Sequence, residues 1–224
     1  MKQGNVLPWS YSTLQAFETC PRRFYLTRIS KQVSEPQHAA SMWGNEVHKA
    51  LEKAVKGEEP LPTRFKEYAS IVTRVRQTAG KKLCEQKFGI TASFRPTDFF
   101  AKDVWFRGVI DLNVIGTKKA ATLDYKTGKI KTDGDQLKLF AAATFTHFPY
   151  LEEVTTGYLW LKDDKLTPAS FTKDDVPVIW QEFLPRVNRM EQAQKNDVWM
   201  PRPSGLCREY CPVGKKLCDF CGKD

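Results

Sequence analysis

The sequence predicts an α/β fold in which helices flank a mixed central sheet, with a helical N-terminal segment and a cysteine-rich C-terminal tail. Up to about residue 82, apolar side chains recur mainly at helical spacing. Runs of aromatic and β-branched residues then alternate with turns and one further helical stretch, which is typical of a sheet with a crossover helix. Four of the six cysteines fall within residues 207–221, a segment too short to fold alone.

The first helix is indicated by signals at both of its ends. Ser12 followed by Gln15 resembles a capping box, and Pro21 breaks the helix after Cys20. A second amphipathic stretch covers residues 22–29. We therefore expect a helical entry before any strand.

Two longer helices are expected before the sheet. Over residues 42–56 the apolar positions have helical spacing, and Gly57 suits the helix end because glycine tolerates left-handed backbone. His48 lies beside this apolar stripe. The second of these helices is expected over residues 65–82.

The strands are predicted from residues that favour extended backbone and from turn residues between them. The expected ranges are 83–90, 104–115, 121–125, 154–162 and 166–171. A helix with one apolar face follows the third range, and that face consists of Leu137, Phe140, Ala141 and Thr144. A hairpin, a crossover helix and a returning strand make a mixed sheet with a right-handed connection.

The last helix is expected over residues 175–195, where Pro185 should kink or divide it. At 224 residues and 41% hydrophobic content, the chain is long enough for one domain over residues 1–224. Its expected parts are a helical N-terminal part (1–82), a sheet core (83–172), a C-terminal helix (173–200) and the cysteine-rich tail (201–224).

The charge balance favours a polyanionic partner. Lysine and arginine total 35 against 26 acidic residues, which gives a formal charge of +9 and a pI near 9.2, as suits nucleic acid. The first residues lack a long apolar core and no run of about 18 apolar residues occurs, so we expect no membrane span and a cytoplasmic protein. In a chain without an export signal, clustered cysteines favour metal ligation over disulfides.

Asp111, Asp124 and Lys126 are the candidates for chemistry. Residues two apart in a strand share a face, so Asp124 and Lys126 project together. If the two strands pair through the turn at Gly116, Asp111 lies close enough to Asp124 for both to bind one hard cation. Mg²⁺ or Mn²⁺ held beside an ammonium group suits phosphodiester hydrolysis, whereas the alternative reading of these residues is a solvated cross-strand ion pair.

The chain contains, in this order, SYSTLQAFETCPRRFYL, GNEVHKALE, RGVIDL, LDYKTGK, DQLKLFAAA and the cysteine cluster. Together these segments resemble the RecB-like branch of the PD-(D/E)XK nuclease superfamily, which includes CRISPR-associated and phage-encoded exonucleases. The resemblance covers nearly the whole chain and implies a restriction-endonuclease-like core. It also implies a metal-dependent deoxyribonuclease, expected to be an exonuclease acting on DNA ends or single strands with little sequence specificity. The alternative is a catalytically idle DNA-binding or adaptor protein that modulates a host nuclease or a CRISPR pathway.

The resemblance implies roles for individual residues. Asp111 and Asp124 become metal ligands, and Lys126 becomes the catalytic lysine. His48 becomes a further metal ligand presented from its helix, and the backbone carbonyl of Tyr125 completes the shell. The implied cofactor of this site is Mg²⁺ or Mn²⁺.

Three further residues take supporting roles in this interpretation. Gln136 matches a glutamine close to the active site of the family, where it contacts the lysine or the DNA backbone. Glu85 matches an acidic strand position of some relatives, but could equally be a surface residue. Glu52, four residues after His48, is expected to orient the imidazole.

The cysteines suggest a second metal centre. In the iron–sulfur members of the branch, one N-terminal and three C-terminal cysteines hold a [4Fe-4S] cluster, and the matching set is Cys20, Cys207, Cys211 and Cys218. Cys221 is then spare. The alternatives are structural Zn²⁺ held by the four cysteines of residues 207–221, or reduced thiols. Cys84, in a strand, is expected to be a small buried hydrophobe.

DNA is the expected partner, and basic residues on two segments are the expected phosphate contacts. The first group is predicted to surround the catalytic hairpin, and the second to form another surface of the N-terminal helices. The two groups are Lys118, Lys119, Lys129 and Lys131, and Arg22, Arg23 and Arg28.

Overall fold

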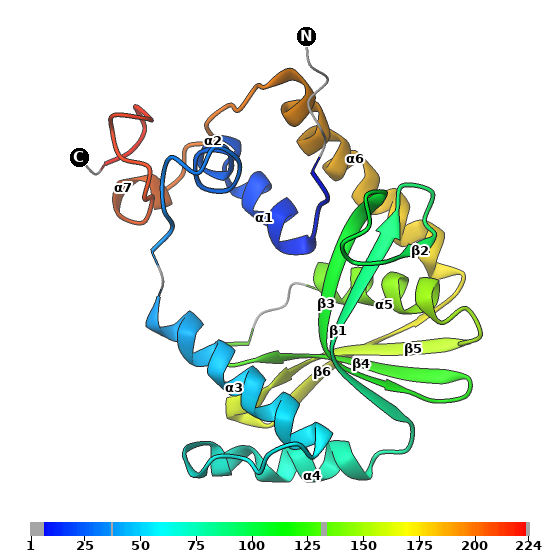
Figure 1. Cartoon of the computed structure of the whole chain (residues 1–224). Helices are drawn as coiled ribbons and strands as arrows, with labels where there is room; N and C mark the ends of the chain where they lie inside the picture. The colour runs from blue at the N-terminus through cyan, green and yellow to red at the C-terminus, as the bar shows by residue number, and fades with distance from the viewer. Residues whose placement is uncertain (1–6, 37, 131–133, 223–224) are drawn as a thin grey trace. The chain divides into compact units, whose positions relative to one another are not determined.

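A computed structural model describes residues 7–36, 38–130 and 134–222 of the chain (Figure 1). Contacts divide the chain into two compact units. The sheet unit is His38–Gln181, and the terminal unit combines Met1–Gln37 with Glu182–Asp224. Each unit buries an apolar cluster of its own.

The sheet unit is built on a six-stranded mixed sheet, which confirms the predicted fold class. Its strands are β1 (Lys81–Thr91), β2 (Pro96–Thr97), β3 (Val104–Ile115), β4 (Lys119–Lys126), β5 (Glu153–Trp160) and β6 (Lys165–Thr172). They lie in the order β2-β1-β3-β4-β5-β6. β4 and β5 pair in parallel, and the other neighbours pair antiparallel. The parallel pair is joined through α5 (Asp135–His147), because parallel strands need a crossover connection.

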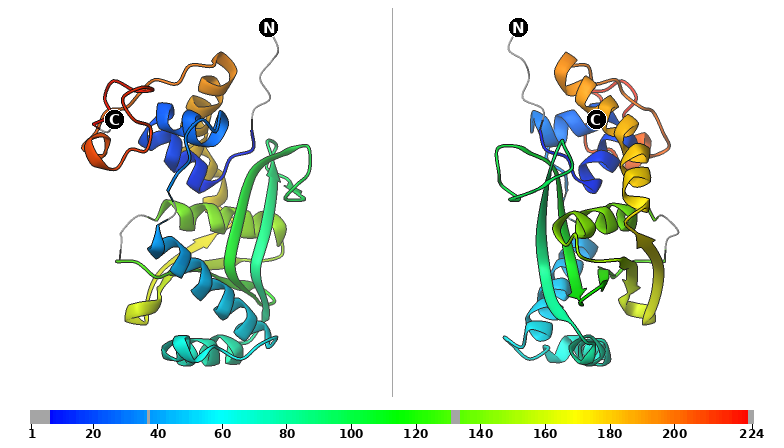
Figure 2. Two further views of the ribbon diagram at one scale, coloured as in Figure 1. Left: turned by 60° about the vertical axis from the view of Figure 1, so that its left-hand side comes forward. Right: turned by 90° about the vertical axis from the view of Figure 1, so that its right-hand side faces the viewer.

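Helices cover both faces of this sheet (Figure 2). The helical segments before it are α3 (Ala39–Lys56), the 3-10 helix η2 (Thr63–Tyr68) and α4 (Ala69–Gln77). Leu51 of α3 packs with Leu112 of β3 in one buried cluster, and Ala141 of α5 packs with Val154 of β5 in another. A short 3-10 helix, η3 (Leu161–Asp163), ends β5. The sheet therefore has α3 and α4 on one face and α5 on the other.

The helix expected over residues 65–82 is present only in part. Its first turns are 3-10, α4 ends at Gln77, and β1 already begins at Lys81. Gly80 has a φ of 117°, and a Cβ at this position would lie 2.9 Å from the carbonyl oxygen of Ile115. The chain therefore has to turn here at a glycine, close against the end of β3, which a helical pattern does not reveal.

The terminal unit gathers segments from both ends of the sequence. It contains α1 (Tyr11–Thr19), α2 (Pro21–Phe24), the π-helical segment η1 (Tyr25–Ile29), α7 (Leu206–Glu209) and the second part of α6 (Asp175–Asn196). The cap of α1 differs from the predicted one, because Ser10 and Thr13 form the capping box. The Ser10 amide donates to Thr13 Oγ1 at 2.7 Å, and Ser10 Oγ accepts from the Thr13 amide at 3.3 Å.

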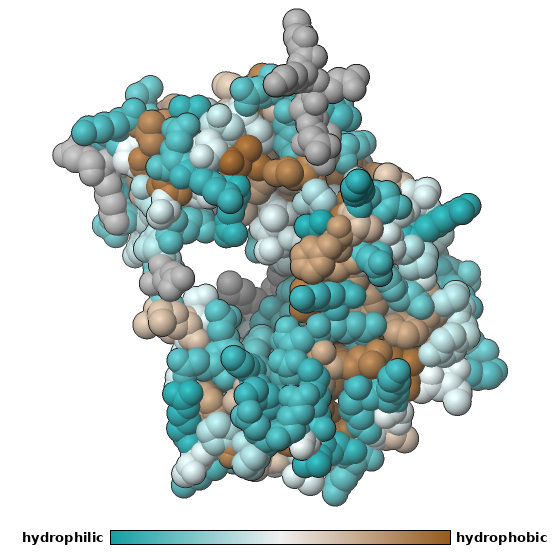
Figure 3. Space-filling view, viewed as in Figure 1, coloured by the Kyte–Doolittle hydropathy of each residue, from teal (hydrophilic) through white to brown (hydrophobic). Residues whose placement is uncertain are grey.

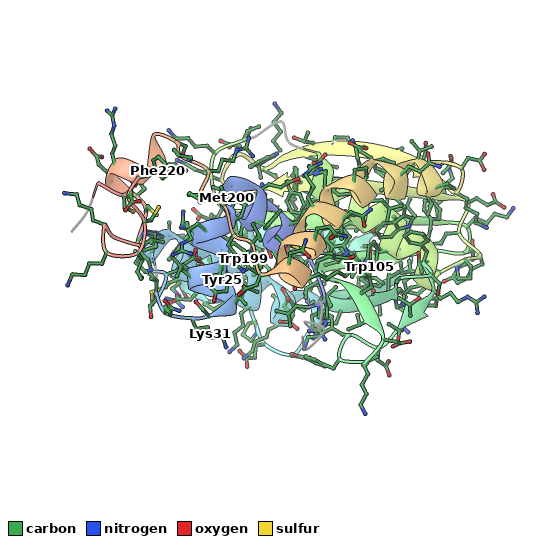
Figure 4. The ribbon with its side chains drawn as sticks, turned by 90° about the horizontal axis from the view of Figure 1, so that it is seen from above. Tyr25, Lys31, Trp105, Trp199, Met200 and Phe220 are labelled. Carbon is green, nitrogen blue, oxygen red and sulfur yellow. The ribbon has the colours of Figure 1, made fainter. Side chains whose placement is uncertain are left out.

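Aromatic packing and an ion pair between α1 and α6 help to hold this unit together. Tyr25 and Trp199 stack with ring centroids 5.0 Å apart (Figure 4). Arg186 donates from Nε and Nη2 to the two carboxylate oxygens of Glu18, each at 2.7 Å. α6 is continuous through Pro185, so the proline does not divide it. A two-point guanidinium–carboxylate contact of this kind fixes α6 against α1.

The surface in Figure 3 is hydrophilic over the outer sides of α3 and α4. Within the described parts of the chain, no helix is both long and apolar enough to cross a membrane. The apolar faces of α3 and α4 are instead used to bury the sheet.

Candidate active site

The end of β4 carries the first group of candidate residues. Asp124 Oδ2 lies 2.6 Å from Lys126 Nζ. The ring of Tyr125, between them in sequence, is buried in the apolar cluster that contains Leu51 and Leu112, called the α3 cluster below. Gln136, in the first turn of α5, accepts from Lys126 Nζ at 3.1 Å and donates to Asp124 Oδ1 at 2.9 Å. The glutamine thus bridges the carboxylate and the ammonium.

A second group lies beside the first and joins three elements. His48 Nδ1 of α3 is 3.3 Å from Asp111 Oδ1 of β3. Ligand atoms of His48, Asp111 and Glu85 of β1 all lie within 4.8 Å of one another. The other oxygen of Asp111 accepts from the Tyr125 amide at 2.6 Å, so the first and second groups are directly connected. This second group is called the His48 group below.

Glu85 reaches the His48 group because the backbone of β1 is irregular at this residue. Its φ is 49°, in the left-handed region that non-glycine residues seldom adopt. Cys84 packs against the α3 cluster, and Glu85, the next residue, also lies beside His48 of α3. The left-handed residue interrupts the alternation of the strand and places its carboxylate in the site. Backbone strain of this kind is concentrated at functional sites.

The electrostatics of the two groups show several like charges in one place. Burial, and then the charge of Asp111, raises the pKa of Asp124 to about 6, although Lys126 opposes this shift. Burial also raises the pKa of Glu85, and Asp111 raises it further. For His48, burial lowers the pKa, but the hydrogen bond and charge of Asp111 outweigh it, so the net pKa is raised. Bringing these carboxylates together is unfavourable unless a cation neutralises them.

These donors fit a divalent cation. Two carboxylates and an imidazole, each only partly exposed, form a ligand set suited to Mn²⁺, and carboxylate oxygens suit Mg²⁺. Asp124 is not a member of the His48 group. Its carboxylate instead pairs with Lys126 and accepts a hydrogen bond from Gln136. Its buried Oδ2 receives no hydrogen bond of good geometry from the described residues, despite the close ammonium. That oxygen retains the capacity to bind a cation.

Two expectations about neighbouring residues need correction. Glu52 does not orient the imidazole, because its carboxylate pairs with Lys56 Nζ at 2.6 Å, while His48 contacts Asp111. Lys118 and Lys119 precede and begin β4, whereas the candidate residues lie at its other end, about 20 Å away at 3.3 Å per residue. These two lysines pair with Glu152 and Glu153 at 2.8 and 2.7 Å.

The other predicted phosphate contacts have varied surroundings. Lys129 is exposed shortly after β4, and Lys131 lies outside the described residues. Arg22 donates to the carbonyl oxygen of Leu217, and Arg23 and Arg28 pair with Glu35 at 3.3 and 2.8 Å. The three arginines therefore serve contacts within the terminal unit.

Five of the six cysteines lie in the terminal unit. Cys20, Cys207, Cys211 and Cys218 line one small pocket, together with Arg22, Arg23 and Arg202. Cys221 is buried in an apolar cluster with Leu26, and its thiol donates to the carbonyl oxygen of Cys211 at 3.9 Å. The structure thus brings the four predicted residues to one pocket, whereas Cys221 does not line that pocket and shares the apolar cluster with Cys211 and Cys218. Cys84 packs in the sheet unit, where burial raises its pKa to about 11, as expected of a structural thiol.

The raised pKa of Asp124 predicts that this residue destabilises the protein when no metal is bound. In EDTA at pH 7.5, we expect Asp124→Asn to raise the free energy of unfolding by about 1–2 kcal/mol, because it removes a buried charge. The melting temperature should rise by about 2–4 °C per kcal/mol. Since a raised pKa means that the folded wild type takes up a proton below about pH 6, the difference should shrink as the pH falls toward 5.

The control for this measurement is Asp163→Asn, which neutralises an exposed carboxylate of the same unit. Differential scanning fluorimetry of both variants at the two pH values gives the comparison. A lower melting temperature for Asp124→Asn at pH 7.5 in EDTA would contradict the prediction.

Fold and geometry together define a class of protein. A mixed α/β sheet whose strands β1, β3 and β4 present carboxylates and a lysine beside a histidine of α3 suits a metal-dependent nuclease. The sequence model of the PD-(D/E)XK nuclease superfamily matches residues 8–219, and the chain belongs to this superfamily.

A solved structure shows the same fold. The crystal structure of a protein described as "Putative exonuclease" from Eubacterium rectale has a TM-score of 0.57 and 11% identity, over 92% of this chain and 88% of that chain. The structure of SSO0001 has a TM-score of 0.48 and 16% identity, over 95% of this chain and 86% of that one. A comparison with curated proteins finds no match. At 11% identity, the likeness to the Eubacterium rectale protein concerns the fold alone.

Proposed function

We propose that the protein is a metal-dependent DNA exonuclease of the RecB-like branch, which acts on DNA ends or single strands with little sequence specificity. The observation that carries the proposal is the meeting of the His48 group with the ion pair of Asp124 and Lys126. Membership of the nuclease superfamily and the formal charge of +9 support nucleic acid as the substrate.

Each residue of the site has a chemical role in this proposal. Mg²⁺ or Mn²⁺, when bound, supplies positive charge that stabilises the developing charge on the phosphate and lowers the pKa of water. His48, Asp111 and Asp124 hold that cation, and the Tyr125 carbonyl adds an oxygen ligand. Glu85 joins this set because it shares the 4.8 Å group with His48 and Asp111.

Lys126 and Gln136 serve the reacting water and phosphate. Asp124 and Gln136 fix the Lys126 ammonium within hydrogen-bond reach of both side chains, so its position is set before DNA binds. From that position Nζ orients the attacking water and donates to a phosphate oxygen as negative charge builds up. Preorganised donors of this kind require little rearrangement during the reaction.

Cleavage of defined DNA substrates tests the proposal. The purified protein is incubated with end-labelled linear DNA and with closed circular DNA, in Mg²⁺, in Mn²⁺ and in EDTA. We expect metal-dependent loss of the terminal label and intact circles. Cleaved circles would indicate an endonuclease, and binding without cleavage in either metal would favour the idle adaptor.

We also propose that Cys20, Cys207, Cys211 and Cys218 hold a [4Fe-4S] cluster in the terminal unit. Their common pocket supports this set, as do the Arg202 and Ser204 amides, which donate to the sulfurs of Cys20 and Cys207 at 3.4 Å each. Such hydrogen bonds and nearby arginines suit thiolates.

The cluster and the zinc alternative differ in one ligand from the other end of the chain, because only the cluster set includes Cys20, which lines the pocket with Cys207, Cys211 and Cys218. A cluster, when bound, supplies a redox-active link between the chain ends, and the four cysteines position it.

A further inference from the structure

The hairpin of β1 and β3 carries an exposed aromatic pair flanked by two cations. Phe99 and Phe100 lie in the loop before β3, and the Phe100 side chain is 74% exposed. Lys87 Nζ lies 5.7 and 5.4 Å from the two ring centroids, and Arg107 Cζ lies 5.3 and 5.7 Å from them. These four residues are called the hairpin patch.

The cations of the hairpin patch have no acidic partner in the part of the chain that the structure describes. Within the described ranges, neither Lys87 nor Arg107 takes part in an ion pair, and the buried Nε of Arg107 has no hydrogen-bond partner. Aromatic faces hold these charges by cation–π attraction, which leaves most of their hydrogen-bond donors unused. Two unneutralised cations beside an exposed ring favour an anionic ligand that also carries a flat apolar surface.

The aromatic pair is fixed to the hairpin. β2 pairs with β1 at Gly89, and a Cβ at Gly89 would lie 2.6 Å from the carbonyl oxygen of Asp98, so the loop rests directly on the strand. Thr97 Oγ1 donates to Asp103 at 3.0 Å and closes the loop at its base. The loop that carries the rings is therefore held in one conformation, so little conformational entropy is lost when the rings bind a ligand.

The hairpin patch continues the face that carries the His48 group. Arg107, Val109 and Asp111 are alternate residues of β3, and alternate residues project to one side of a strand. The intervening Phe106, Gly108 and Ile110 are buried. Opposite them, Lys87 pairs with Val109 and stands two residues after Glu85. Figure 3 shows hydrophobic residues among hydrophilic ones over this hairpin.

We propose that the hairpin patch binds single-stranded DNA, with a base stacked on Phe100 and phosphates bound by Lys87 and Arg107. The proposal rests on the proposed function for the substrate and adds the form in which the substrate is bound. Arg107 is four residues from Asp111, about 13 Å along the strand, or roughly four stacked nucleotides. A duplex offers no free base face along its length, so the patch selects unpaired strands.

Binding measured without cleavage tests the inference. The full chain in EDTA is titrated into a fluorescent oligothymidylate and into a blunt duplex of the same length. We expect Phe100→Ala to weaken oligothymidylate binding about tenfold and to change duplex binding less than about twofold. Phe100→Tyr should retain binding, because its ring can still stack. The exposure of Phe100 makes both variants compatible with the native fold.

Two further readouts separate stacking from charge. A 2-aminopurine base in the oligonucleotide should be quenched by the wild type and less by Phe100→Ala. Lys87→Gln should reduce the salt dependence of binding by about 0.7 in the slope of log K against log salt, whereas Phe100→Ala should leave that slope unchanged. Tyr150→Ala is the control, because it removes an exposed aromatic ring outside the hairpin patch. Tyr150 precedes β5, near the end of the sheet where β4 begins at Lys119.

Unchanged oligothymidylate binding by Phe100→Ala, an equal loss on duplex, or no oligothymidylate binding by the wild type would each overturn the inference. Because EDTA prevents metal-dependent cleavage, this experiment measures binding alone, and its outcome is separate from the test of the nuclease proposal. If the wild type never cleaves DNA but Phe100→Ala loses single-strand binding, the binding role of the hairpin patch is supported and the nuclease proposal is contradicted.

Discussion

Lys126→Ala is expected to lower the rate of DNA cleavage by about a thousandfold while DNA binding persists. The substitution removes the ammonium that Asp124 and Gln136 hold in place, and with it the donor for the attacking water and the phosphate. Lys118→Ala is the matched control, because it removes an exposed lysine near the opposite end of β4. Single-turnover cleavage of end-labelled DNA measures the rates.

Asp111→Ala should lose cleavage to a similar extent for a different reason. It removes an oxygen ligand and the partner of His48, so calorimetric titration should show loss of Mn²⁺ binding, whereas Lys126→Ala should still bind Mn²⁺. Glu85→Gln distinguishes the ligand sets, since weakened Mn²⁺ binding requires Glu85 in the shell. Near-wild-type cleavage by Asp111→Ala at saturating Mn²⁺ would show that the site is elsewhere.

Cys20→Ser is expected to destabilise the protein more than a serine substitution at Cys221 does. Without the N-terminal ligand the cluster should be lost, together with the brown colour of iron–sulfur centres, and the melting temperature should fall by about 10 °C or more. The reason is that the apolar cluster of the tail is small, so we expect ligation to Cys20 to contribute much of the stability of this segment.

Cys221→Ser is the control for this experiment, because Cys221 is excluded from the pocket of the other four cysteines. It should keep the colour and lose only the stability due to packing with Leu26. A colourless wild type with about one zinc per chain, retained in Cys20→Ser and lost in Cys221→Ser, would establish the zinc alternative. Elemental analysis of the three proteins decides between the metals.

Local signals predicted most of the fold. Runs of β-branched and aromatic residues located each expected strand, and helical spacing located α3, α5 and α6. The end of α4 was misplaced because Gly80 turns the chain against Ile115, a contact between residues far apart in sequence. β2 was missed because two residues containing a proline carry no strand pattern.

The candidate site was predictable only as far as strand periodicity and family resemblance extend. The pairing of Leu112 with Leu123 sets Asp111 opposite Asp124, as the turn at Gly116 indicated. Glu85 was not predicted to join the His48 group, because regular alternation would place it on the other side of β1 from Cys84. Its left-handed backbone depends on the surrounding sheet, and no residue type in β1 signals it.

The His48 group draws on α3, β1 and β3, and its neighbours Asp124 and Gln136 come from β4 and α5. His48, Glu85 and Asp111 are 37 and 26 residues apart in sequence, so two long stretches of chain must close before the His48 group forms, and such closure is slow relative to helix formation. During synthesis, α3 and β1 emerge from the ribosome well before β4 and α5. A nascent chain consequently has no assembled site, and the proposed nuclease chemistry requires the sheet unit to have folded as a whole.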